Sequence, residues 1–244
     1  MRIKTDTFLF FGLLTLLLGS CDLENNKKNN TNVENNQLMK LKNAEIYATV
    51  EEAVGNISFT ANGDLVYSHH PFFEPQTRVV IMDAKAKNIQ PFPNEKWNTP
   101  RETDENYLSN VLGIRNDKNG IVWMIDMAQR NPIRPKIVGW NTKTDTLERI
   151  YFLDQSTNKS SQPNDMVVDT KNGAFIIADE GIGNGGDGSK AAFIVVDMVT
   201  GKTRRLLEGH RTTKPENNPT IIDGEILAVD GTPLLVGNDG ITAD

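Results

Sequence analysis

The chain has 244 residues, of which 38% are hydrophobic and 24% are charged, and this composition excludes a wholly disordered protein. It carries 26 Lys and Arg against 32 Asp and Glu, and the net charge of −6 argues against a nucleic-acid partner bound through its phosphates. Its single cysteine, Cys21, excludes an intramolecular disulfide framework and a metal site built from cysteines.

Residues 1–20 have the pattern of a secretory signal peptide. Arg2 and Lys4 precede an apolar run over residues 8–18, and small residues follow. This run is shorter than the roughly 20 residues that span a bilayer. The segment Leu18-Gly-Ser-Cys21 resembles the bacterial lipobox, which implies cleavage before Cys21 and acylation of its thiol. The alternative is an ordinary cleavage site with an incidental cysteine.

Residues 21–40 are predicted to be a lipidated tether. Seven of the thirteen residues in 24–36 are Asn and only Val33 is apolar, so this stretch cannot bury enough surface to fold. We therefore expect a cell-envelope protein anchored outside the cytoplasm by its lipid, with the bilayer as one partner. Asp22 resembles an inner-membrane retention signal, but the choice between inner and outer membrane stays open.

Residues 41–244 are predicted to form an all-β fold. Short β-branched and aromatic runs alternate with Gly, Asn, Asp and Pro, which is typical of strands joined by tight turns. The clearest of these runs cover residues 64–67, 78–82, 120–125, 136–140, 173–177, 192–196 and 233–236.

These runs repeat in the same order, an inner hairpin followed by an outer one. Three features recur in each repeat: a leading Asn at Asn56, Asn110 and Asn164, a turn Gly at Gly63, Gly120 and Gly173, and an outer turn residue at Asp83, Asn141 and Asp197. Two hairpins in about 55 residues make one four-stranded blade of a β-propeller. A β-sandwich also has many short strands, but nothing in it requires such a repeat.

The order of several segments resembles the bacterial branch of the major royal jelly protein/yellow family. The resemblance runs from Leu41 to the end of the chain and includes Ser68-His-His-Pro-Phe72, Val122-Trp-Met-Ile-Asp126, Ile177-Ala-Asp-Glu180 and Asp239-Gly-Ile241. It implies a secreted six-bladed propeller that, in several animal members, binds small organic ligands in or near the central channel. The resemblance to gluconolactonase/regucalcin propellers is more distant.

The resemblance also predicts that the propeller is incomplete. Six blades of this size need more residues than 41–244 provide, so about three to four are expected, and residues 237–244 read as the first strand of a further blade. Either the chain is a fragment, or another copy or chain supplies the missing blades.

The first strands of propeller blades line the central channel, so residues that open them converge on one site. By the repeat these are Asn56, Asn110, Asn164 and, in the partial blade, Asp239, which we predict as ligand-binding candidates. Hard oxygen ligands suit Ca²⁺ or Mg²⁺, and a metal, if one is bound, would use Asn110, Asn164 and Asp239. The resemblance to gluconolactonases implies a Glu at position 56, where this chain has Asn. The competing interpretation is that these asparagines cap turns.

The Gly-rich segment, the histidines and the tryptophans are expected to have structural roles. Gly181-Ile-Gly-Asn-Gly-Gly186 matches G-x-G-x-x-G, but a strand and not a helix is expected after it, so no dinucleotide site is predicted. His69, His70 and His210 lack the motifs of a catalytic triad or zinc site and are assigned to turns or packing. Trp97, Trp123 and Trp140 are predicted core residues, with a ligand-stacking wall as the alternative.

The leading hypothesis is therefore a non-catalytic envelope lipoprotein whose propeller binds a small ligand or a protein partner, with no required cofactor. The alternatives are a divalent-metal-dependent lactone hydrolase of the gluconolactonase type and an inactive gene fragment.

Overall fold

The computed structural model describes residues 44–101, 104–128, 133–229 and 231–243. The chain divides into two compact units, Met1–Tyr47 and Ala48–Asp244, and the strands among the described residues belong to the second. The predicted signal peptide, the lipid attachment at Cys21 and the tether lie outside the described residues and remain predictions. Of the helices that the structure describes, none has the length and apolar character needed to cross a bilayer.

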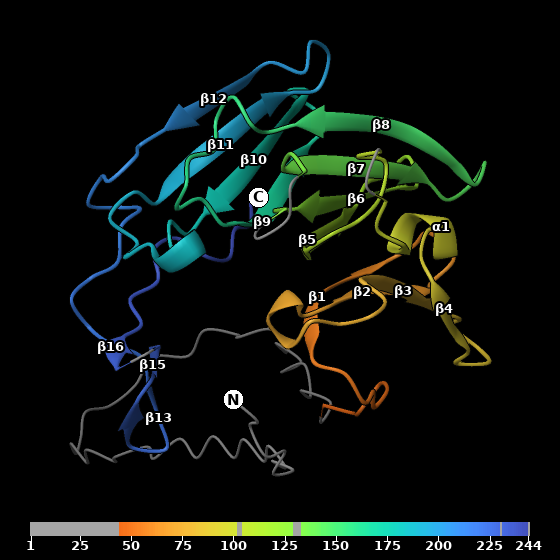
Figure 1. The fold of residues 1–244 in the computed structure, drawn as a ribbon. Helices are drawn as coiled ribbons and strands as arrows, with labels where there is room; N and C mark the ends of the chain where they lie inside the picture. The colour runs from red at the N-terminus through yellow and green to blue at the C-terminus, as the bar shows by residue number, and fades with distance from the viewer. Residues whose placement is uncertain (1–43, 102–103, 129–132, 230, 244) are drawn as a thin grey trace, which may run out of the picture. The chain divides into compact units, whose positions relative to one another are not determined.

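Three four-stranded antiparallel sheets, each made from four consecutive strands, form the blades of a β-propeller (Figure 1). Blade 1 contains β1 (Val54–Phe59), β2 (Leu65–His69), β3 (Val79–Met82) and β4 (Ile89–Pro91). Blade 2 contains β5 (Val111–Asn116), β6 (Ile121–Asp126), β7 (Lys136–Asn141) and β8 (Thr146–Phe152). Blade 3 contains β9 (Pro163–Asp169), β10 (Ala174–Asp179), β11 (Ala192–Asp197) and β12 (Thr203–Leu206). The predicted all-β propeller fold is confirmed.

The remaining elements are short. The helix α1 (Glu95–Asn98) connects blade 1 to blade 2, and the 3₁₀ turns η1 (Pro71–Phe73) and η2 (Gly183–Gly185) lie in the loops after β2 and β10. Two small hairpins follow blade 3, made by β13 (Ile221–Ile222) with β14 (Glu225–Ile226) and by β15 (Ala228–Val229) with β16 (Thr232–Pro233). The strand predicted over residues 233–236 is therefore wrong beyond Pro233.

The turns of the hairpins explain why the repeat is visible in the sequence. Gly63, Gly120 and Gly173 all have positive φ, between +68° and +86°, which only glycine adopts without strain. In the outer hairpins, one side-chain oxygen of Asp83, Asn141 or Asp197 accepts hydrogen bonds from the backbone N–H groups two and three residues later. Each predicted turn residue is thus confirmed as a local determinant of its hairpin.

The inner strand of every blade carries a β-bulge near its start. Opposite the last residue of the second strand lies Val54 in blade 1, Val111 in blade 2 and Pro163 in blade 3. The first residues that pair again after the bulge occupy equivalent positions in the three blades, and they are Ile57, Ile114 and Met166. This register shows that Asn56, Asn110 and Asn164 are not equivalent positions, because Asn56 follows the start of β1 by two residues, Asn110 precedes β5 and Asn164 is second in β9. The predicted equivalence of the three asparagines is wrong because the connections between strands differ in length from blade to blade.

Adjacent blades pack through their inner strands, with β5 contacting both β1 and β9. One hydrophobic cluster joins blade 1 to blade 2 and includes Trp97 and Trp140, and a second joins blade 2 to blade 3 and includes Trp123. All three tryptophans are buried, which confirms the prediction that they belong to the core.

Candidate functional site

A pocket of about 330 Å³ lies where the starts of β1, β5 and β9 meet the chain that follows β16. One part of its wall is apolar and aromatic, formed by His70, Phe72, Leu112, Ile182, Leu234 and Val236. The rest of the lining is polar, formed by Asn56, Gln162, Asn164, Asp165, Glu180 and Asp239. Pockets that combine an apolar wall with a few converging polar groups are typical of small-molecule sites.

Four of the polar side chains form a connected cluster. Asn164 Nδ2 donates to Glu180 Oε1 and to Asp239 Oδ1, and so joins the two carboxyl groups. Gln162 Nε2 donates to the other Glu180 oxygen, Oε2, at 2.6 Å. The amides of Asn164 and Gln162 therefore hold the Glu180 carboxyl, which follows β10, next to the Asp239 carboxyl, which follows β16.

Glu180 is only 3% exposed, so its ionised form lacks the hydration it has in water. Burial, and secondarily the negative charge of Asp239, raise the pKa of Glu180 to about 8, while the hydrogen bonds from Asn164 and Gln162 act in the opposite direction. At neutral pH Glu180 therefore holds a proton beside Asp239, and the pair can donate and accept hydrogen bonds.

Arg115 of β5 is not among the lining residues, but it binds two side chains that are, Asp165 and Asn56. Arg115 forms an ion pair with Asp165 at 2.5 Å and also donates to Asn56 Oδ1 at 3.1 Å. Asp165 Oδ2 in addition accepts from the backbone N–H of Ile241 at 3.3 Å. Blades 1, 2 and 3 and the segment after β16 are thereby linked through one charged pair at the pocket.

The structure brings three of the four predicted ligand-binding residues, Asn56, Asn164 and Asp239, to this pocket. Asn110 is not among the lining residues; its backbone N–H donates to Asp126 Oδ1 at 3.0 Å and its carbonyl accepts from Met127. It is the structural counterpart of Gln162, whose carbonyl accepts in the same way from Glu180. Two of the three predicted metal ligands, Asn164 and Asp239, thus lie together.

Sequence reasoning missed Gln162 and Glu180 as site residues. The available signal was Ile177-Ala-Asp-Glu180, a polar pair directly after a run of apolar strand residues. Nothing in the sequence distinguished the two acids: Asp179 ends β10 and is fully buried in the blade, whereas Glu180 faces the pocket.

Asp179 and its counterpart Asp126 fix the strand ends that position the pocket. Asp126 accepts from the backbone N–H groups of Ser109, Asn110 and Ala128 at 2.8–3.0 Å and pairs with the fully buried Lys136 at 3.0 Å. Both blades therefore use a buried aspartate with a basic partner to tie the end of the second strand to the loop before the first.

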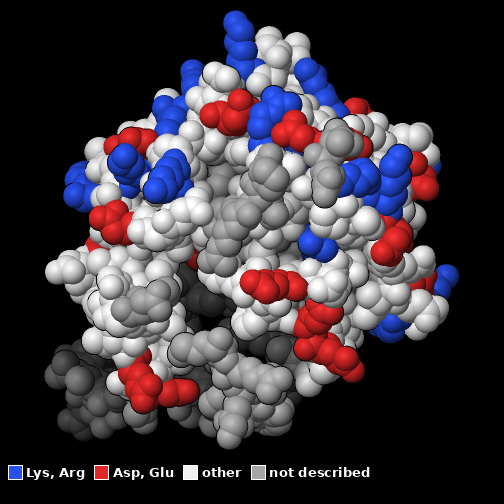
Figure 2. All heavy atoms as spheres, in the orientation of Figure 1, with Lys and Arg blue, Asp and Glu red and all other residues white. Residues whose placement is uncertain are grey.

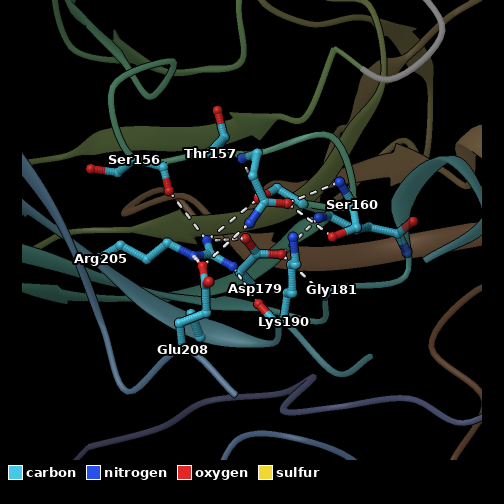
Figure 3. Close-up of polar contacts among 12 residues, drawn as sticks. Ser156, Thr157, Ser160, Asp179, Gly181, Lys190, Arg205 and Glu208 are labelled. Carbon is cyan, nitrogen blue, oxygen red and sulfur yellow. Dashed lines mark hydrogen bonds and ion pairs between the residues drawn. The ribbon is translucent and has the colours of Figure 1, made fainter. Parts of the chain in front are cut away.

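In blade 3 the basic partner is Arg205 of β12, which reaches into a polar cluster beside Asp179 (Figure 3). Arg205 pairs with Asp179 at 2.5 Å and also donates to the carbonyls of Ser156 and Lys190. Asp179 accepts from the backbone N–H of Gln162 at 2.7 Å. The Arg205 network therefore fixes Gln162, whose side chain holds Glu180.

The histidines have the structural roles predicted for them. His69 Nδ1 lies 2.7 Å from the Thr77 carbonyl and 2.9 Å from Glu52. His70 caps η1 through the backbone N–H of Phe72 at 3.3 Å, and His210 Nδ1 lies 2.8 Å from Thr212 Oγ1. His70 is in addition one of the residues that line the pocket.

The Gly-rich loop 181–186 forms the short turn η2 and is followed by β11, as predicted, so it does not open a helix that could bind a pyrophosphate. Elsewhere, basic and acidic side chains are interspersed around the upper part of the face drawn in Figure 2. Within the described part of the chain, no three His, Cys, Asp or Glu side chains are grouped as a metal-binding cluster.

The fold and this pocket define the chain as a β-propeller protein with a small polar pocket at the inner ends of its blades. No protein-family model and no curated protein matches the sequence.

Several solved structures share features of the chain's fold. It is similar to YCF48 bound to D1 peptide, with 11% identity, a TM-score of 0.44, and 78% of this chain and 49% of that chain covered. It is also similar to an auxiliary nutrient binding protein from Bacteroides ovatus, with 15% identity, a TM-score of 0.39, and 68% and 33% covered. A third similar structure is the extracellular domain of the putative hybrid two component system BT4673 from B. thetaiotaomicron. Its identity is 9% and its TM-score is 0.41, and the match covers 66% of this chain and 17% of that chain. The chain therefore spans less than half the length of each of these proteins.

Proposed function

We propose that this chain is a lipid-anchored cell-envelope protein of the royal jelly/yellow type, whose propeller binds a small polar ligand without transforming it. The lipobox at Cys21 supports the anchor, and the signal-peptide pattern supports a location outside the cytoplasm. In this proposal residues 1–20 are removed, residues 21–40 form the tether and residues 41–244 carry the binding function.

The observation that carries the binding proposal is the cluster of Gln162, Asn164, Glu180 and Asp239, which lines the same pocket as apolar residues that include Phe72. A protonated Glu180, the carboxyl of Asp239 and two amides present both donors and acceptors within one pocket, which suits a ligand rich in hydroxyl or amino groups. The aromatic ring of Phe72 offers a flat surface against which such a ligand packs.

The test is a thermal-shift screen of the purified chain against single solutions of neutral monosaccharides, amino acids and primary amines. A binder raises the melting temperature because it stabilises only the folded state. For any compound that does so, Asn164→Ala should reduce affinity by at least about tenfold, since it removes the amide that joins both carboxyls. Asn218→Ala is the matched control, because Asn218 is exposed and lies outside the pocket-lining set.

Two results would count against this function. The first is that no compound of the three classes shifts the melting temperature. The second is that Asn164→Ala and Asn218→Ala bind every active compound with equal affinity. The second result would locate binding elsewhere on the chain.

The second candidate is a divalent-metal-dependent lactone hydrolase, and the proximity of Asn164 and Asp239 favours it. A Ca²⁺ or Mg²⁺ ion there would have the Asp239 carboxylate and the Asn164 amide oxygen as ligands, and it would polarise a lactone carbonyl. Asn110 belongs to the loop before β5, held by Asp126, and would not complete the set. Lactone turnover that depends on added Ca²⁺ or Mn²⁺ and is lost in Asp239→Asn would establish this activity in place of simple binding.

A further inference from the structure

The loop after β2 presents two neighbouring phenylalanines, and only one of them belongs to the pocket. Phe72 lines the pocket and is 52% exposed. Phe73 is not among the lining residues and is 72% exposed. The fold gains little from a Phe73 side chain in this position, because most of its apolar surface stays in water.

The backbone of this loop is held by local hydrogen bonds. The His70 side chain accepts from the backbone N–H of Phe72 at 3.3 Å, and the His70 carbonyl accepts from that of Phe73 at 3.1 Å. The ring of the buried Pro71 fixes its φ, and its carbonyl accepts from the backbone N–H of Glu74 at 3.2 Å. The two phenylalanines therefore stand on an ordered turn, so packing a ligand on them costs little ordering entropy.

The imidazole of His70 joins the two phenyl rings. Its centroid lies 4.8 Å from that of Phe72 and 5.8 Å from that of Phe73, with interplanar angles of 71° and 75°. His70 also lines the pocket, so Phe73 contacts a lining residue without being one. Burial lowers the pKa of His70, so its ring is uncharged at neutral pH. The three rings form one uncharged aromatic surface that begins at the pocket and continues beyond its lining.

The polar part of the lining has the groups that recognise hydroxyls. The amides of Gln162 and Asn164 and the carboxyls of Glu180 and Asp239 supply donors and acceptors. A sugar ring combines a flat face of C–H bonds, which packs on an aromatic ring, with hydroxyl groups around its edge. Aliphatic amino acids and simple amines have no such face. Aromatic rings beside amides and carboxyls therefore fit a carbohydrate better than they fit those ligands.

The size of the pocket limits how much of a carbohydrate it holds. Its volume of about 330 Å³ is at the lower end of the roughly 300–1,000 Å³ of small-molecule sites, so only a short part of a longer chain fits inside. The next unit of such a chain then lies where the aromatic surface continues, at Phe73.

We propose that the pocket binds the terminal sugar of an oligosaccharide against Phe72, and that Phe73 forms a second subsite, where it stacks on the adjoining sugar. This inference rests on the proposed ligand-binding function and names the class of ligand. It gives the exposed Phe73 ring a role that the fold does not.

The test is isothermal titration calorimetry of the full chain in a detergent without a sugar headgroup. It compares glucose with maltose and cellobiose, mannose with mannobiose, and galactose with galactobiose. At least one disaccharide should bind at least about tenfold more tightly than its monosaccharide, because it makes a second stacking contact. In Phe73→Ala this gain should disappear, while the affinity for the monosaccharide changes less than about twofold, which also verifies that the variant is folded.

Two further variants separate stacking from general apolar contact. Phe73→Trp keeps a flat ring and should retain the gain, whereas Phe73→Leu keeps apolar area without the ring and should lose most of it. Leu147→Ala is the matched control, since Leu147 is 41% exposed on β8 and lies outside the pocket lining. This control should bind both sugars as the wild type does.

The possible outcomes distinguish the oligosaccharide site from the function on which it rests. Binding of amino acids or amines but of no carbohydrate leaves the proposed function in place and overturns the carbohydrate assignment. Equal affinity for monosaccharide and disaccharide, or a gain that survives Phe73→Ala, overturns the second subsite. Binding of none of the three classes overturns the proposed function and the oligosaccharide site together.

Discussion

At the scale of single residues, Glu180 makes the fold sensitive to pH. Its pKa is raised from 4.5 to about 8, so the folded state takes up a proton that the unfolded state releases. A carboxyl with a raised pKa gives its full stabilising contribution below the unfolded value, and this contribution is lost as the pH rises through the folded value. The stability linked to Glu180 should therefore fall between about pH 4.5 and pH 8.

We predict that Glu180→Gln, which keeps the shape of the protonated acid, removes this fall. Near pH 9 the variant should be more stable than the wild type by on the order of 3 kcal/mol, or roughly 6–12 °C in melting temperature, and near pH 4 the two should be similar. Calorimetry in EDTA between these pH values provides the measurement. Parallel pH profiles for the two proteins would contradict the attribution of this pH dependence to Glu180. The control is Glu216→Gln, which alters an exposed residue and should have the pH profile of the wild type.

Asp126 illustrates a buried charge that serves the strands and not the ligand. It pairs at 3.0 Å with Lys136, and both side chains are 0% exposed. Asp126→Asn should lower the free energy of unfolding by about 3–5 kcal/mol, because the Lys136 ammonium would stay buried without its counter-charge. Urea denaturation measures this loss. Glu105→Gln, which breaks the largely exposed pair with Arg134, should cost less than about 1 kcal/mol, and equal losses would refute the comparison.

At the scale of elements, the three blades fill the same space beside their second and third strands with different residues. In the second and third strands, blade 1 pairs Val66 with Ile81 and blade 3 pairs Ile176 with Val195. Blade 2 instead pairs Trp123 with Gly139, and a Cβ added at Gly139 would overlap the Trp123 ring. A large residue opposite a glycine thus fills the space that two aliphatic residues fill in the other blades.

This exchange predicts strong coupling between the two positions. Gly139→Val should cost about 1–3 kcal/mol through overpacking, and Trp123→Val about 3 kcal/mol or more through the cavity it leaves. The double variant, which copies the aliphatic pairs of blades 1 and 3, should be at least about 1 kcal/mol more stable than the sum of the two losses implies. A double-mutant cycle in urea provides the measurement, and additive losses would contradict the exchange.

At the scale of the whole molecule, the proposed anchor governs where the blades are held. Cys21→Ser should prevent acylation and move nearly all of the protein from the membrane fraction to the soluble fraction, because the tether 24–36 has only one apolar residue to hold it at a bilayer. Fractionation with mass spectrometry of the N-terminal peptide measures this directly. A Cys21→Ser protein that remains in the membrane fraction would contradict the lipid anchor.

The blade repeat could be predicted because its determinants are local. A positive φ at Gly120 and an oxygen of Asp197 that accepts two nearby N–H groups act within a few residues, so their sequence pattern survives in every blade. Alternating turn residues and β-branched runs were therefore enough to identify the second and third strands of blades 1–3.

The composition of the site could be predicted only in part. Asn164 and Asp239 were identified because they open a repeat, and both reach the pocket. Asn110 is not equivalent to Asn164, because the loops before β5 and β9 differ in length. Sequence spacing alone does not reveal this difference or the β-bulges near the starts of the two strands.

The sequence by itself thus determined the fold, the turns and the order of the blades, since each of these depends on neighbours along the chain. The tertiary structure alone decided that Glu180 joins Asp239 in a pocket while the adjacent Asp179 is buried against Arg205. It also decided which apolar residues are covered: Ile57 and Ile114 look alike in the sequence, and only the presence of a preceding blade buries one of them. Burial depends on contacts between distant segments, which no local pattern encodes.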